Sequence, residues 1–150
     1  MISIALYKPD IPQNTAAVIR LAACLGTKVH VIEPCGFNLE DPRFKRVVMD
    51  YVNICKILRY DNFELFKSKN SKNRLILMTT KSNKNYNKFK YKKNDVLLFG
   101  RESAGVPKEI HKQVDNRIRI PIKNRARSLN IAMSAAIVVS EALNQNKLLK

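Results

Sequence analysis

Apolar residues recur along this chain in short runs that alternate with longer amphipathic segments. The runs ISIALY (2–7) and KVHVIE (28–33) are typical of buried strands, and NTAAVIRLAACLG between them has apolar residues at helical spacing. We expect Asn14 to cap the start of this helix and Gly26 to end it. These segments predict a strand, a helix and a second strand at the start of the chain.

The remaining chain continues this alternation. Four further strands are predicted over residues 54–58, 74–80, 95–100 and 117–121. Four further helices are predicted over residues 43–51, 61–69, 107–114 and 128–145, the second of them capped near Asp61. The alternation indicates an α/β fold with a mainly parallel sheet covered by helices on both faces. With 150 residues and no repeat or long linker, the chain is predicted to be a single domain over residues 1–150.

One stretch, KSNKNYNKFKYKKN (81–94), interrupts the pattern, and we call it the lysine segment. It has six lysines, no acidic residue and three aromatic residues, Tyr86, Phe89 and Tyr91. Such a segment can contact phosphates and stack bases. It can equally be a solvated surface excursion before the next strand. The sequence leaves both interpretations open.

The net charge of the chain indicates which class of partner it binds. The chain has 28 Lys and Arg against 12 Asp and Glu, a formal net charge of +16, which favours a polyanionic partner over a coding bias for lysine. Nucleic acid is favoured over membrane, because no apolar run is long enough to span a bilayer and no cleavable signal opens the chain. The odd number of scattered cysteines, without CxxC, predicts reduced thiols in a cytoplasmic protein and no metal site. Both histidines, His30 and His111, are predicted to be structural or solvated.

Candidate chemistry gathers where predicted strands end. Parallel sheets bind ligands beyond the carboxyl ends of their strands, and YKPDIPQNT, MTTKS, FGRESAGVP and IPIKNRARSLN all follow strands here. Neither GxGxxG nor a P-loop is present, which argues against dinucleotide and nucleotide triphosphate sites of those kinds. Gly100 and Gly105 flank a turn in which the backbone can approach a flat ligand, and Glu102 within the turn can accept hydrogen bonds.

Two polar features accompany helices. Ser128 and Asn130 are good helix caps, and a helix N-terminus also presents free amide donors to a ligand. Arg20 is a lone charge in the apolar AAVIRLAACL and must reach a partner or the rim of the protein. Because we place Asn14 at the cap of the same helix, we expect Asn14 and Arg20 to border one site.

The segments IALYKPDIPQNTAAVIRLAACLG, TTK, LLFGRESAGVP and IRIPI followed by RSLN, in this order, resemble the SPOUT superfamily of RNA methyltransferases. The resemblance covers nearly the whole chain and is strongest to the small enzymes that methylate the ribose 2′-oxygen of the tRNA wobble nucleotide. It implies a parallel-sheet SPOUT fold with a deep C-terminal trefoil knot, S-adenosylmethionine bound in the knot, and a homodimer whose active site uses both subunits. The implied partner is the anticodon region of tRNA, and the implied substrate nucleotide is cytidine or uridine 34.

Site residues follow from the same resemblance. Asn14 and Arg20 match the first motif, and the implied catalytic group is Arg20, assisted by Asn14, Glu102 and Asn130. Whether Arg20 accepts the ribose proton or stabilises the developing alkoxide stays open at this stage. The implied cofactor-binding residues match the second and third motifs and two strand ends: Met78, Gly100, Ile120, Ser128 and Leu129.

The chain also departs from the family pattern. Ala16 and Ala17 stand where relatives commonly have Gly-Asn, and Ala132 and Met133 where they often have Ser-Asn, so polar contacts near the site are lost. Two alternatives to wobble methylation therefore remain. One is ribose methylation at another tRNA position or in ribosomal RNA, and the other is an RNA-binding SPOUT protein without catalysis. Loss of catalysis is disfavoured by the joint presence of five residues: Asn14, Arg20, Glu102, Ser128 and Asn130.

Overall fold

The computed structural model describes residues 1–48 and 50–149. Six parallel strands form one sheet in the order β3, β2, β1, β5, β4, β6. The strands are β1 (Ser3–Tyr7), β2 (Lys28–Ile32), β3 (Ile57–Tyr60), β4 (Leu75–Met78), β5 (Val96–Phe99) and β6 (Asn116–Ile118). The helices are α1 (Pro12–Cys24), α2 (Pro42–Val48), α3 (Tyr51–Ile54), α4 (Phe63–Lys69), α5 (Lys108–Gln113) and α6 (Ile131–Gln145), with a 3-10 turn, η1, at Tyr86–Lys88. The predicted α/β fold with a parallel sheet is confirmed.

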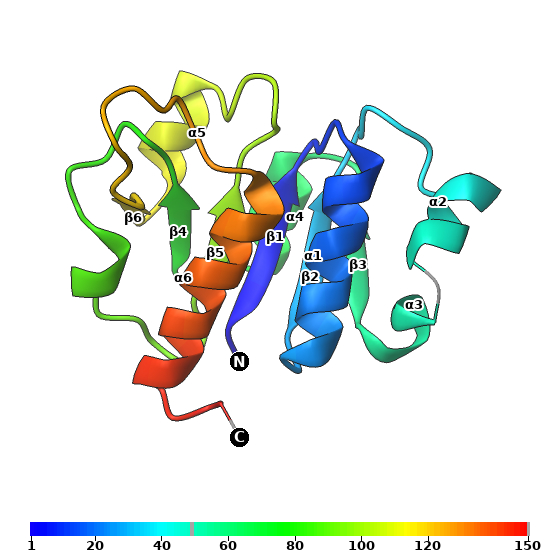
Figure 1. Cartoon of the computed structure of the whole chain (residues 1–150), viewed down its shortest axis with the longest axis horizontal. Helices are drawn as coiled ribbons and strands as arrows, with labels where there is room; N and C mark the ends of the chain where they lie inside the picture. The colour runs from blue at the N-terminus through cyan, green and yellow to red at the C-terminus, as the bar shows by residue number, and fades with distance from the viewer. Residues whose placement is uncertain (49, 150) are drawn as a thin grey trace.

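Helices cover both faces of the sheet, as predicted. Figure 1 shows α1 and α6 side by side on one face, with α4 and α5 on the other. The sheet is therefore buried on both sides, and successive strand residues enter different cores. In β1, Ile4 and Leu6 pack toward α1 and α6, whereas Ala5 and Tyr7 pack with residues of α4 and α5. This explains the continuous apolar runs in the sequence.

Several predicted boundaries are wrong. Asn14 lies inside α1, because Pro12 starts this helix and proline suits the first helical position. Gly26 ends α1 as predicted, with a positive φ of 64°. Asn62, rather than Asp61, caps α4, since its side-chain oxygen accepts from Leu65 N at 2.8 Å. The predicted helix 128–145 begins only at Ile131, and Asn130 is its cap.

The structure differs most from the predicted elements over residues 43–58. The predicted helix 43–51 is replaced by the shorter α2 and α3, and residue 49 lies outside the described residues. The predicted strand 54–58 is displaced to 57–60, because Ile54 ends α3 and is 67% exposed. Apolar content alone cannot separate a short strand from a helix end.

The lysine segment turns its aromatic side chains inward. Tyr91 is buried, and its hydroxyl donates to the carbonyl of Tyr86 at 2.9 Å. Phe89 packs edge-on against Tyr91, with 5.0 Å between ring centroids, and is half-buried against the core. The base-stacking interpretation is therefore wrong for these rings, whereas Lys88 and Lys90 remain exposed.

Candidate active site

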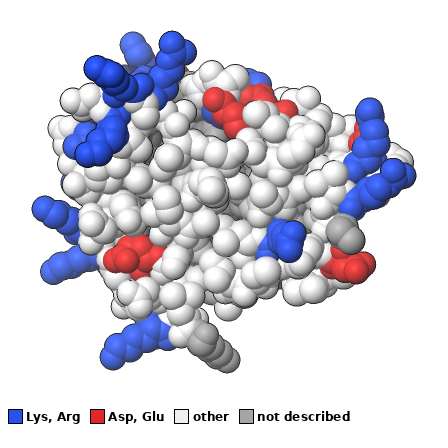
Figure 2. Space-filling model, viewed as in Figure 1, with Lys and Arg blue, Asp and Glu red and all other residues white. Residues whose placement is uncertain are grey.

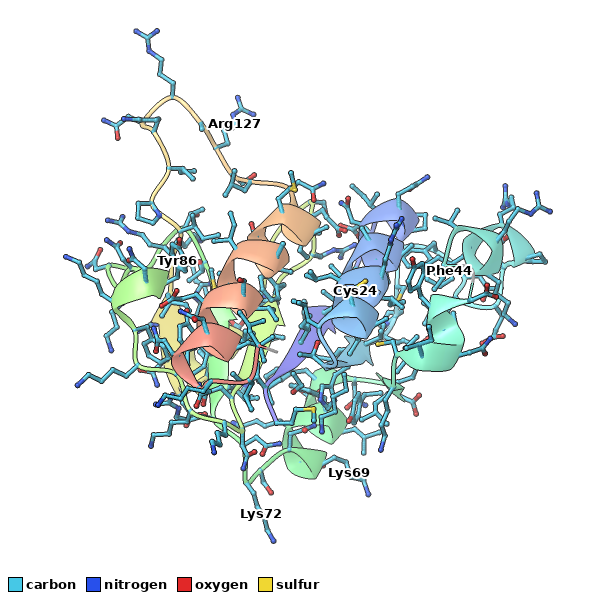
Figure 3. All side chains as sticks on the ribbon, turned by 60° about the horizontal axis from the view of Figure 1, so that its bottom comes forward. Cys24, Phe44, Lys69, Lys72, Tyr86 and Arg127 are labelled. Atoms are coloured by element: carbon cyan, nitrogen blue, oxygen red, sulfur yellow. The ribbon has the colours of Figure 1, made fainter. Side chains whose placement is uncertain are left out.

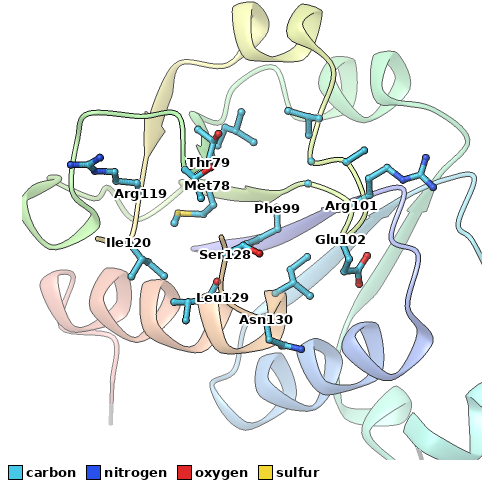
Figure 4. A pocket seen from close by; sticks show the side chains of 18 of the residues that line it. Met78, Thr79, Phe99, Arg101, Glu102, Arg119, Ile120, Ser128, Leu129 and Asn130 are labelled. Atoms are coloured by element: carbon cyan, nitrogen blue, oxygen red, sulfur yellow. The ribbon is translucent and has the colours of Figure 1, made fainter. Parts of the chain in front are cut away.

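A cavity of about 520 Å³ opens where β4, β5 and β6 end and α6 begins. Figure 4 shows side chains from all of these elements pointing into it. Its volume lies within the usual range for small-molecule sites. The cavity brings together all but one of the predicted site residues: Asn14, Met78, Gly100, Glu102, Ile120, Ser128, Leu129 and Asn130.

The cavity has an apolar part and a polar end. Met78, Phe99 and Ile120 stand at strand ends, and Leu129 comes from the loop that leads into α6 (Figure 4). Leu129 is 42% exposed and offers an apolar surface to the cavity. This part suits a flat apolar group such as a purine ring.

The polar end is a chain of three side chains from three motifs. Asn14 Nδ2 donates to Glu102 Oε1 at 3.3 Å, and Asn130 Nδ2 donates to Asn14 Oδ1 at 2.9 Å. Asn130 also caps α6, because its Oδ1 accepts from Ala132 N at 2.8 Å. Asn14 is thus the bridge between the turn after β5 and the start of α6.

Asp10 holds the turn that carries Glu102. Its carboxylate accepts hydrogen bonds from the Arg101 guanidinium and from Ser103, and these bonds hold the pKa of the Asp10 carboxyl well below its usual range. The backbone N–H of Asp10 donates in return to Glu102 Oε2 at 2.8 Å. The sequence analysis missed Asp10, although it lies in YKPDIPQNT between β1 and α1.

Gly100 is required by a close backbone contact. A Cβ on Gly100 would lie 2.6 Å from the Cα and carbonyl carbon of Gly105. Arg101 and Gly105 pair across the turn, with backbone N to O distances of 3.1 and 2.8 Å. Gly105 itself adopts φ of 66°, a conformation that favours glycine. Both glycines therefore shape the turn, and its backbone forms one wall of the cavity.

Arg20 does not line the cavity of its own chain. Its guanidinium carbon lies 5.2 Å from the ring centroid of Tyr51 in α3, and the side chain is exposed. Six residues turn an α-helix by about 600°, so Arg20 points about 120° away from Asn14 around α1. The expectation that both residues border one site is wrong within a single chain.

The structure adds cavity residues that the sequence analysis did not assign. Thr79, Lys81, His111 and Arg119 all line it. Lys81 and Arg119 follow strand ends, which was the available signal, whereas His111 was predicted to be structural or solvated and instead reaches the cavity from α5. His30 is structural as predicted, because it is fully buried and its Nδ1 lies 2.9 Å from the Tyr60 hydroxyl.

Within residues 1–48 and 50–149, no three His, Cys, Asp or Glu side chains are grouped so that they could hold a metal ion. No helix in the same ranges has the length and apolar character needed to cross a bilayer.

A protein of Beijerinckia indica named tRNA (cytidine(34)-2′-O)-methyltransferase is 44% identical over 144 residues, which are 95% of this chain and 90% of that protein. The Escherichia coli K12 protein of the same name is 36% identical over 147 residues, covering 97% of this chain and 94% of that protein.

Solved structures agree with these relatives. One, described as giving structural insights into the 2-OH methylation of C/U34 on tRNA, superposes with a TM-score of 0.92 at 33% identity and covers 98% of this chain and 97% of that one. An AdoMet-bound rRNA methyltransferase from Sinorhizobium meliloti has a TM-score of 0.87 at 27% identity, covering 95% of this chain and 56% of that one. The model of the SpoU rRNA Methylase family matches residues 1–140, and this chain belongs to that family.

Proposed function

We propose that this protein is a tRNA ribose 2′-O-methyltransferase that transfers a methyl group from S-adenosylmethionine to cytidine or uridine at position 34. Relatives of nearly equal length carry this name, at identities of 36% to 44%. The observation that carries the proposal is the single chain of hydrogen bonds at the cavity that joins Glu102, Asn14 and Asn130. Three motifs far apart in sequence thus meet at one place.

The cavity residues fit S-adenosylmethionine. Met78, Ile120 and Leu129 would hold its adenine between apolar surfaces, while the backbone of the Gly100 turn and Ser128 would offer hydrogen bonds. The Glu102 carboxylate provides negative charge at the same mouth. When bound, this cofactor supplies an activated methyl group on a positively charged sulfur.

Side chains of the protein align the ribose and stabilise the charge that develops on it. A ribose hydroxyl is a very weak acid, so the site must align it and stabilise negative charge on the 2′-oxygen as its proton passes to solvent water and the oxygen takes the methyl group. Asn14 and Asn130 orient the ribose, and Glu102 fixes Asn14 through the 3.3 Å hydrogen bond. Arginine keeps its proton at neutral pH, so we assign Arg20 to electrostatic stabilisation of the 2′-oxygen.

Arg20 can take this role only in a homodimer. It lies on a side of α1 that faces away from the cavity of its own chain, so a second copy must receive it. Helix α6, which packs beside α1, carries the exposed apolar residues Met133 and Ile137, whereas its Val138 and Val139 are buried in the core. One face of α6 thus packs in the core, and another is left for a partner subunit.

The proposal includes the C-terminal trefoil knot and a cytoplasmic location. Arg119, directly after β6, is hydrogen-bonded through its backbone to Lys84 and Tyr86. Gln145, at the end of α6, also forms hydrogen bonds with the backbone of Phe89 and Tyr91. These hydrogen bonds support an arrangement in which the last part of the chain passes beside the lysine segment. The three free cysteines fit a reducing compartment.

The test is methyl transfer in vitro. Purified protein is incubated with labelled S-adenosylmethionine and either unfractionated tRNA or ribosomal RNA, and 2′-O-methyl groups are mapped by nucleotide. We expect label on tRNA at cytidine or uridine 34. Label confined to ribosomal RNA would replace this function with the alternative that the family description and the Sinorhizobium meliloti structure suggest. Absence of transfer to either RNA by folded, cofactor-binding protein would favour the non-catalytic alternative.

A further inference from the structure

Among the residues that the structure describes, cations that lack an acidic partner lie on one side of the cavity. Lys81 and Arg119 line it where β4 and β6 end. The turn after β5 contributes Glu102 and also Arg101, whose charge is paired with Asp10. Ile122 and Ser128 line the cavity, and the loop between them carries Arg125 and Arg127, which are both exposed. Arg117 on β6 is also exposed. We call Lys81, Arg117, Arg119, Arg125 and Arg127 the basic rim.

The basic rim is not neutralised within the described part of the chain. The salt bridges found there engage other cations: Arg43, Lys45, Arg59, Arg74 and Arg101. Arg119 Nε donates to the neutral amide of Asn85 at 3.2 Å, which orients its guanidinium without cancelling its charge. His111 lines the cavity beside these cations, and its pKa is lowered first by burial and then by the charges of Lys81 and Arg117.

The surface view agrees with this separation. In Figure 2, Lys and Arg side chains gather at the upper left, where Figure 1 shows the loop before α6, and acidic side chains lie to the right of them. Figure 3 shows Arg127 projecting from this loop, far from Lys69 and Lys72 at the opposite end of the molecule.

Lys81 begins the lysine segment at the cavity, but residues 88–93 of this segment are too far from the cavity to contact the same phosphates. Gln145 near the end of α6 accepts from Tyr91 N at 3.1 Å and donates to the Phe89 carbonyl at 3.0 Å. Asn130, at the cavity, caps the other end of this 15-residue helix. A helix of this length spans about 20 Å, so Lys90 and Lys92 lie roughly that far from Asn130.

We infer that the basic rim binds RNA phosphates beside the methylated nucleotide, so that the backbone crosses the cavity mouth on the β6 side. This inference rests on the proposed function and adds the surface on which the substrate lies. The Glu102 carboxylate on the opposite side of the mouth repels phosphate, which favours approach from the side of the basic rim. The polyanionic partner that the net charge of +16 favours then contacts the basic rim rather than residues 88–93 of the lysine segment.

The test uses pairs of variants that remove equal charge. Lys81→Gln/Arg117→Gln and Arg125→Gln/Arg127→Gln alter the rim, Lys90→Gln/Lys92→Gln alters the lysine segment, and Lys69→Gln/Lys72→Gln is the control at the opposite end. The affinity for unfractionated tRNA is measured from about 50 to 200 mM salt. Each lost phosphate contact lowers the salt slope by about one, so each rim pair should lower it by about two and weaken binding about tenfold or more at 100 mM salt.

The other two pairs should change affinity less than about twofold. Calorimetry with S-adenosylmethionine, expected to give wild-type affinity for Arg125→Gln/Arg127→Gln, verifies that this variant is folded. A rim slope equal to that of the control, or a larger effect of the lysine-segment pair, would overturn the inference while methylation by the wild type leaves the proposed function standing. Conversely, steep rim-dependent binding without methylation of nucleotide 34 would refute only the proposed function.

Discussion

The side-chain amide of Asn130 donates a hydrogen bond to Asn14 Oδ1 at 2.9 Å, although the two residues are 116 positions apart in the sequence. Asn130 serves the fold at the same time, because its Oδ1 accepts from Ala132 N and caps α6. One side chain therefore combines a capping role, through its oxygen, with a site role, through its nitrogen. The two roles use different atoms and can be separated by substitution.

Asn130→Asp keeps the capping oxygen and removes the amide donor to Asn14. We expect the free energy of unfolding to stay within about 0.5 kcal/mol of wild type, because aspartate is an equally good cap. Methyl transfer should fall about 100-fold, since Asn14 and the ribose lose their alignment. Asn130→Ala should lose about 1 kcal/mol of stability in addition. Urea unfolding and single-turnover methylation measure the two effects, and full activity of Asn130→Asp would show that Asn130 is only a cap.

Arg20→Ala should abolish methyl transfer and leave cofactor binding near normal, because the cavity contains no atom of Arg20 from its own chain. Some tRNA affinity should remain, since many other cations contribute to phosphate binding. Arg46→Ala, another exposed arginine on a neighbouring helix, is the matched control. Single-turnover assays with saturating cofactor measure the rate of methyl transfer in both variants. Activity within a few-fold of wild type would reduce Arg20 to a surface contact with Tyr51, worth about 0.5 to 1 kcal/mol.

Gly100→Ala should distort the turn after β5. Its new methyl group would lie 2.6 Å from the Gly105 backbone, so we expect a loss of about 1 to 3 kcal/mol in unfolding free energy and at least about tenfold weaker S-adenosylmethionine binding. Gly26→Ala is the control, because it strains a left-handed residue by about 1 kcal/mol, far from the cavity. Calorimetry should find normal cofactor affinity for the control alone. Unchanged affinity in Gly100→Ala would remove this turn from the cofactor site.

His30 should make the protein less stable in mild acid. Burial, with a smaller contribution from Lys28, lowers the pKa of His30 to about 4 from an ordinary value of about 6.5. Between these values the unfolded chain binds a proton that the folded protein does not, so stability is lost as pH falls. The contribution between pH 7.5 and pH 5 is about 2 kcal/mol.

Urea unfolding of wild type and His30→Phe at both pH values checks this expectation. The variant removes the titrating group and should show a flatter dependence on pH, even if its stability at pH 7.5 is lower because Tyr60 loses its partner. Equal losses in both proteins on acidification would contradict the assignment.

Local pattern in the sequence determined the elements and the edge of the sheet at which the site lies. Continuous apolar runs such as Val96–Phe99 mark strands buried on both faces, and alternation with helices makes the sheet parallel. Because parallel strands end at one edge, the motifs that carry Met78, Glu102 and Asn130 could be placed together from the sequence alone, and all three residues line the cavity.

Tertiary structure decided which side chains face one another. The angular phase of α1 directs Asn14 to the cavity and Arg20 away from it, and the phase depends on Pro12 starting the helix. Likewise, the core below the lysine segment takes up Tyr91, and Gln145 anchors the segment at the far end of α6. These contacts join residues distant in sequence, and their free energy comes from packing and desolvation that no local pattern records.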